Sequence, residues 1–189
     1  MEKPELYFTT DTEWRKWLHQ NYNLYPKGVY LIFYKVETNI PSMRWEEAVK
    51  VAICYGWIDS TVKSLGDGKR RQYFGPRNAK SSWSKVNKDY VKELQKEKLI
   101  HSSGKLVINE AKKSGAWTKM DHVENLLIPE DLQIAFNTTP LAYKNFTGFA
   151  PSYRKAYLSW LHQAKRETTR NARIVKIIAY CKANQKTRD

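Results

Sequence analysis

The stretch WIDSTVKSLGDGKRRQYFG, residues 57–75, limits the possible folds of this chain more than any other part of it. Its first half alternates in character and is rich in β-branched side chains, which is typical of a strand. Gly-Asp-Gly at 66–68 is a strong turn signal, and RRQYFG then returns as a second strand. Hairpin geometry places residues 57–60 opposite roughly residues 74–77. We therefore predict a small antiparallel sheet.

Two helices and one further strand are predicted before this hairpin. Thr10 and Glu13 form a capping box in front of the apolar pattern of the first helix. The near-continuous apolar run VYLIFYKV, residues 29–36, is typical of a strand that is covered on both faces. Ser42 is expected to cap the second helix, which ends at Gly56. The first third of the chain is thus predicted as α-β-α-β-β.

From residue 81 onward the apolar spacing is helical, and Ser81 or Ser82 is expected to cap the next helix. The predicted fold class is α+β, with a small antiparallel-rich sheet and helices in the N-terminal unit and an all-helical C-terminal unit. We expect the N-terminal unit to span residues 1–118, a polar connector to span 119–128, and the helical unit to span 129–187.

The 189 residues include 33 basic and 19 acidic side chains, which gives a net charge of +14. The excess lies in two blocks, because residues 62–113 carry 14 basic against 5 acidic side chains and residues 150–189 carry 10 against 2. A solvated basic surface that only aids solubility accounts for these blocks, and a nucleic-acid partner is the alternative to consider.

Several other classes of protein find no support in the sequence. We see no signal peptide and no apolar run long enough to span a bilayer, so we expect a cytoplasmic protein. The four histidines are scattered, and the two cysteines are far apart in apolar stretches, so no metal site and no disulfide are expected. Motifs of hydrolases, kinases and dehydrogenases are absent, and we predict no cofactor.

The hairpin and the helix after it supply the candidate ligand-binding residues. Asp59 and Arg77 come close in the predicted register, and a helix start at SSWSKVN, residues 81–87, favours an anion. Together they suggest a pocket for a small anionic ligand, although the same residues could serve only as a buried ion pair, helix caps and core. The predicted ligand-binding residues are Trp57, Asp59, Arg77, Trp83, Ser84 and Asn87.

A second candidate lies in AKRETTRNARI, where four basic residues surround a junction between helices. They form a possible phosphate-binding ridge, provided that one helix continues through the threonine pair; surface charge and helix capping are the alternative. The ridge would consist of Lys165, Arg166, Arg170 and Arg173.

Four dense stretches, AICYGWIDS, FGPRNAKSSWSKVN, AKKSGAW and SYRKAYLSWLHQAKRETTRNARI, resemble the YdeI/OmpD-associated (OmdA-like, bacteriocin-protection) family of bacterial proteins. The resemblance spans roughly residues 10–185, and the segment from about 129 to 187 looks like the OmdA domain. It implies a link to tolerance of bacteriocins and cationic antimicrobial peptides, and an envelope location in some members, but no catalytic residues. A protein of charge +14 repels cationic peptides, so their direct capture is not expected.

Three functions therefore remain open on the sequence. The first is a stress-tolerance protein that binds a small anionic ligand or a protein partner without a known reaction. The second is a nucleic-acid-binding module that uses the two basic blocks. The third is an enzyme with Asp59 as base and Arg77 as anion clamp. The oligomeric state and the identity of the ligand are left open.

Overall fold

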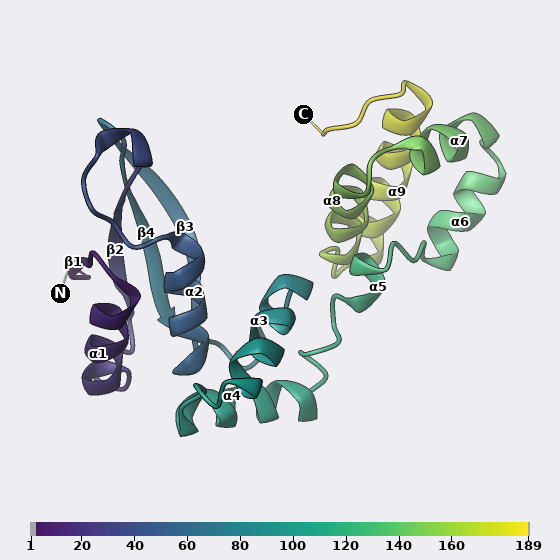
Figure 1. Ribbon diagram of the computed structural model, residues 1–189. Helices are drawn as coiled ribbons and strands as arrows, with labels where there is room; N and C mark the ends of the chain where they lie inside the picture. The colour runs from purple at the N-terminus through teal and green to yellow at the C-terminus, as the bar shows by residue number, and fades with distance from the viewer. Residues whose placement is uncertain (1–2, 189) are drawn as a thin grey trace. The chain divides into compact units, whose positions relative to one another are not determined.

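The computed structural model describes residues 3–188, which divide between Thr118 and Lys119 into two compact units (Figure 1). We call residues 3–118 the N-terminal unit and residues 119–188 the C-terminal unit. The first contains a four-stranded sheet with helices, and the second is built from helices, so the predicted α+β class is confirmed.

The elements of the N-terminal unit are β1 (Glu5–Tyr7), α1 (Asp11–Asn21), β2 (Val29–Tyr34), the 3-10 turn η1 (Val36–Thr38), α2 (Trp45–Cys54), β3 (Trp57–Gly66), β4 (Lys69–Pro76), α3 (Lys85–Lys96) and α4 (Ser102–Lys113). The strand order is β1-β2-β4-β3; β1 runs parallel to β2, and the other pairs are antiparallel. The short strand β1 was not predicted.

The predicted hairpin is confirmed, including its register. Trp57 lies opposite Pro76 and Asp59 opposite Phe74. The turn between the strands places Asp67 at a φ of 46°, between two glycines that also have positive φ. Glycine and aspartate adopt positive φ at a lower energetic cost than most residues, so Gly-Asp-Gly suits this turn.

The starts of the helices are partly as predicted. The Thr10 side chain accepts from the Glu13 backbone N–H, and the Glu13 carboxylate returns the contact, so the capping box is present. Two expectations about caps are wrong. The Ser42 hydroxyl accepts from the backbone N–H of Tyr34 instead of capping α2, which begins three residues later. The cap of α3 is Ser84 rather than Ser81 or Ser82.

One face of the sheet carries the core of the N-terminal unit. Helices α1 and α2 lie on the same face of the sheet and contact one another (Figure 1). Trp14 of α1 packs edge-on against Phe74 of β4, and its indole N–H donates to the Ala48 carbonyl of α2 over 3.2 Å. The expectation that β2 is covered on both faces holds only in part, because the outward side chain of Ile32 is buried while those of Tyr30 and Tyr34 are half-buried.

The C-terminal unit consists of α5 (Asp121–Glu124), α6 (Glu130–Asn137), α7 (Pro140–Gly148), α8 (Pro151–His162) and α9 (Glu167–Lys182). The stretch 119–128 is more than the expected connector, because it forms α5 and buries Val123 in the core of this unit. The longest helix, α9, has 16 residues, and nowhere in residues 3–188 does a helix have the length and apolarity to cross a bilayer.

Candidate functional site

Arg77 follows β4 directly and is held at the end of the hairpin. Its backbone N–H donates to the Gly56 carbonyl over 2.9 Å, so the residue continues the ladder between β3 and β4. The side chain is only 8% exposed. Its guanidinium carbon lies 3.7 Å from the centre of a Trp83 ring, and Nη1 donates to the Ser82 carbonyl over 3.1 Å. The hairpin and the segment before α3 therefore meet at this guanidinium.

The Arg77 guanidinium is buried without an acceptor for all its donors. Its Nε and Nη2, together with Nε1 of Trp83, are buried N–H groups that have no hydrogen-bond partner among residues 3–188. Burial lowers the pKa of Arg77 from 12.5 to about 10, while the negative charge of Asp59 acts in the opposite direction. Buried donors without acceptors are unfavourable, and an anion could satisfy them.

Asp59 is half-buried and is engaged by residues other than Arg77. Its Oδ2 accepts from Nε1 of Trp45 over 2.9 Å and from Nε2 of Gln72. In the part of the chain that the structure describes, Asp59 and Arg77 form no ion pair, although the charge of Asp59 is felt at Arg77. The hairpin thus brings the two residues into one neighbourhood without joining them.

The other predicted ligand-binding residues divide between core and surface. Trp57 is 2% exposed, and its Nε1 donates to the Tyr22 carbonyl over 3.0 Å, so it belongs to the core beside α1. Ser84 is exposed, and its Oγ accepts from the backbone N–H of Asn87 as the cap of α3. The structure therefore brings Arg77 and Trp83 together at the start of α3, whereas Trp57 packs elsewhere.

A feature that the sequence did not reveal is a hollow at the far end of the hairpin, which we call the hairpin groove. Three adjoining cavities of about 320, 240 and 460 Å³ all have Lys35 in their walls. The groove is lined by a mixture of aromatic, aliphatic and basic side chains, chiefly Phe33, Lys35, Arg44, Trp45, Val62 and Arg70.

The hairpin groove carries an excess of positive charge. Four cations, Lys35, Arg44, Lys69 and Arg70, line its cavities, against two carboxylates, Glu37 and Asp67. The guanidinium of Arg70 lies over the Phe33 ring at 5.4 Å, because the two residues are opposite one another on β4 and β2. Only that strand pairing joins them, so no local sequence motif could have indicated the groove.

Trp45 connects the groove to the predicted residues. It lies in the wall of the 320 Å³ cavity, and 39% of its surface is exposed. The same indole donates its N–H to Asp59. Asp59 therefore lies behind the groove wall, and the Trp45 side chain is held in place by a hydrogen bond to a carboxylate.

The predicted basic ridge of the C-terminal unit is divided. Arg170 makes two hydrogen bonds to the carboxylate of Asp131, which lower the pKa of Asp131. Arg173 donates to the Trp160 carbonyl and lies over its ring. Lys165 and Arg166 are exposed, and helix α9 begins only after Arg166, so no single helix carries the four residues.

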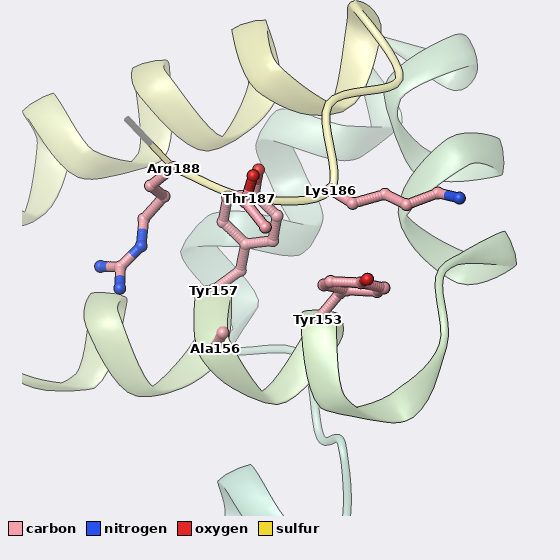
Figure 2. A pocket seen from close by; sticks show the side chains of 6 residues that line it. All are labelled: Tyr153, Ala156, Tyr157, Lys186, Thr187 and Arg188. Atoms are coloured by element: carbon pink, nitrogen blue, oxygen red, sulfur yellow. The ribbon is translucent and has the colours of Figure 1, made fainter. Parts of the chain in front are cut away.

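A smaller cavity, of about 190 Å³, lies between α8 and the segment that follows α9 (Figure 2). Its basic residues Lys186 and Arg188 point away from one another in Figure 2, and Arg188 lies over the Trp160 ring at 4.8 Å. Two cations that diverge cannot clamp one anion. The cavity is lined by Tyr153, Ala156, Tyr157, Lys186, Thr187 and Arg188.

No group of three or more His, Cys, Asp or Glu side chains within residues 3–188 is arranged to hold a metal ion. His122 and His162 are neighbours, with ring centres 4.5 Å apart. Burial, followed by the charges of nearby basic groups, lowers the pKa of His162.

Comparison with known families divides the chain in a similar way. Residues 6–107 match the family described as Domain of unknown function (DUF8412), and residues 125–184 match the OmdA family, described as Bacteriocin-protection, YdeI or OmpD-Associated. Searches of curated proteins and of solved structures give no match. The resemblance to OmdA is confirmed in the C-terminal unit, while the N-terminal stretches match a different family. The chain thus belongs to the DUF8412 family and contains an OmdA domain.

Proposed function

We propose that this OmdA-containing protein binds a small anionic ligand in the hairpin groove. The observation that carries the proposal is the placement of Lys35, Arg44 and Arg70 around one hollow, next to the exposed ring of Trp45. The larger cavities, of about 320 and 460 Å³, fall within the usual range for small-molecule sites.

The chemistry of the lining favours a carboxylate or phosphate that also has a flat or apolar part. Arginine presents its N–H groups as a planar fork that can bind two oxygens of one anion. Arg70 rests on Phe33, which holds one side of the fork against an apolar surface. Trp45 offers a ring face for stacking, and its hydrogen bond to Asp59 keeps that ring oriented.

The residues predicted from the sequence supply a second candidate for the same function. Within residues 3–188, Arg77 and Trp83 have three buried N–H groups without acceptors, and the cap of α3, Ser84, follows directly. An anion near these donors would relieve the unpaired charge of Arg77 and would face the positive end of α3. The alternative reaction, with Asp59 as base and Arg77 as clamp, has less support because two donors already occupy Oδ2 of Asp59.

Calorimetric titration with phosphate, pyrophosphate and citrate at low ionic strength tests the proposal. We expect saturable binding of at least one of these anions, which Arg70→Gln weakens by about tenfold or more, because a hydrogen bond to a charged group contributes about 1.5–3 kcal/mol. Lys176→Gln removes one positive charge at an exposed position of α9, outside every candidate site, and is the matched control.

Three results would speak against the groove. The first is that none of the anions binds, and the second is an equal loss of affinity in Arg70→Gln and in the Lys176→Gln control. The third is loss of binding in Arg77→Met while Arg70→Gln binds normally. The last result would move the site to the second candidate. Unfolding curves of each variant show whether a loss of binding reflects loss of folding.

The biological role we propose is a contribution to tolerance of bacteriocins or antimicrobial peptides from within the cytoplasm. It rests on the description of the OmdA family. Ligand binding, rather than capture of cationic peptides, would provide the effect, since a chain of charge +14 repels such peptides. A strain that lacks the protein should become more sensitive, and the wild type but not Arg70→Gln should restore tolerance. Equal restoration by both would separate tolerance from the groove.

A further inference from the structure

The face of the sheet opposite α1 and α2 carries a cluster of tyrosines. Side chains alternate along a strand, so the residues of β2 that point away from the core are Tyr30, Ile32 and Tyr34. Tyr73 of β4 is directly opposite Tyr30, with ring centres 6.0 Å apart, and Tyr7 of β1 contacts Tyr34 edge-on at 5.4 Å. We call these five residues the tyrosine face.

Two small residues allow the ring of Tyr73 to lie along the sheet. A Cβ atom at Gly75 would lie 2.2 Å from the Tyr73 hydroxyl, and one at Gly28 would lie 2.6 Å from it. The ring therefore passes across both glycines, and its hydroxyl donates to the Lys27 carbonyl over 3.2 Å. An aromatic ring fixed in this way presents its flat side rather than its edge to a ligand.

Basic side chains surround the tyrosine face. The ammonium of Lys3 lies 4.4 Å from the centre of the Tyr73 ring, and the guanidinium of Arg71 lies 4.5 Å from that of Tyr30. Lys63 is opposite Arg71, and Lys69 is opposite Tyr34. The carboxylate on this face, Glu5 of β1, forms an ion pair with Arg71. The face thus combines stacking surfaces with a net positive charge.

We infer that the tyrosine face binds single-stranded nucleic acid. One base would stack on Tyr73, a second would pack against Tyr30, whose ring is inclined at 72° to that of Tyr73, and the phosphates would contact Lys3 and Lys63. Aromatic rings on an open sheet, next to basic residues, suit unpaired bases because every base has a stacking face and every linkage carries a charge. A duplex hides its base faces, so it would gain only the electrostatic part.

This surface borders the hairpin groove at Tyr34 and Lys69, which also line the groove, whereas the rings of Tyr30 and Tyr73 line none of its three cavities. Arg70 and Arg71 are consecutive on β4 and therefore point to opposite faces of the sheet. Charge complementarity favours a polyanion over a protein surface for the tyrosine face, because the cations stand directly over the rings. The flexible side chain of Lys3 can move from the Tyr73 ring to a phosphate when a base stacks, whereas Arg71 is held by its ion pair with Glu5.

Fluorescence anisotropy of the whole protein with a labelled 12-nucleotide oligouridine, at low salt, tests the inference. We expect binding that Tyr30→Leu and Tyr73→Leu each weaken by at least about fivefold, since stacking on one aromatic ring is worth roughly that much or more. These changes leave the charge untouched. Tyr153→Leu, at an exposed tyrosine of α8, is the matched control and should bind like the wild type.

If a tyrosine variant does not fold, Lys63→Glu provides a second test. Lys63 is exposed, so its replacement should leave the fold intact. It should weaken binding and should lower the slope of log affinity against log salt by about 0.7 or more. Binding of a DNA strand of matching sequence would support the same surface. No binding at low salt, equal affinity for a 12-base-pair duplex, or unchanged binding in a folded Tyr30→Leu, Tyr73→Leu double variant would each overturn the inference.

Discussion

Replacement of Arg77 by methionine should leave the stability of the N-terminal unit nearly unchanged, although the side chain is buried and charged. Folding lowers the pKa of Arg77 from 12.5 to about 10. At every pH below about 10, keeping the guanidinium protonated therefore reduces the free energy of unfolding by roughly 3 kcal/mol. Methionine removes this penalty. It also removes the bond to Ser82 and the stacking on Trp83, which contribute about 1.5–3 and about 2 kcal/mol.

Because these contributions oppose one another, we expect the free energy of unfolding to change by less than about 2 kcal/mol. Loss of one partner from a buried ion pair would instead cost about 3–5 kcal/mol. Urea denaturation of Asp59→Asn, Arg77→Met and the double variant at pH 7 measures the coupling between the two residues. We expect a coupling below about 2 kcal/mol. A coupling of 3–5 kcal/mol would show that Asp59 and Arg77 are paired in solution and would refute this reasoning.

Three further predictions concern packing and charge elsewhere in the chain. Gly104→Ala should destabilise the protein by about 1–3 kcal/mol in urea denaturation, because its Cβ would lie 2.3 Å from the Cys54 carbonyl oxygen, whereas Gly148→Ala, with nothing within 4 Å, should not. Arg170 lowers the pKa of Asp131, so their pair stabilises the fold above about pH 3.8 and its contribution is lost as the pH falls further. Asp131 is 40% exposed, so Asp131→Asn should cost only about 1 kcal/mol at pH 7 and should flatten the acid side of a plot of melting temperature against pH. Both cysteine thiols are buried, so a thiol reagent should label them only after unfolding, and rapid labelling of the native protein would contradict this.

The features that the sequence predicted correctly are those set by neighbouring residues. The Gly-Asp-Gly turn fixed the hairpin register, and the Thr10 and Glu13 pair fixed the start of α1. Alternation and capping leave local signals in a single sequence, but neighbouring serines compete as caps, and Ser84 rather than Ser81 or Ser82 caps α3.

The other features that were missed depend on contacts between distant segments. Strand β1 has only three residues and exists because it pairs with β2. The hairpin groove needs Arg44, from the segment before α2, and Arg70, from β4, in the wall of one cavity with Phe33 of β2. Trp57 was predicted as a ligand-binding residue, but it also contacts a distant segment. Its indole N–H donates to the Tyr22 carbonyl after α1, and its ring packs against Trp17 of α1.

The most direct test of small-anion binding in the groove is an NMR titration of isotopically labelled protein with inorganic pyrophosphate. The chain has seven tryptophans, and the indole N–H of Trp45 is in the groove wall, bonded to Asp59, while that of Trp83 is buried beside Arg77. We predict that the Trp45 indole signal shifts in a saturable way and that the Trp83 signal stays in place. No shift of Trp45, or a shift confined to Trp83, would contradict binding in the hairpin groove.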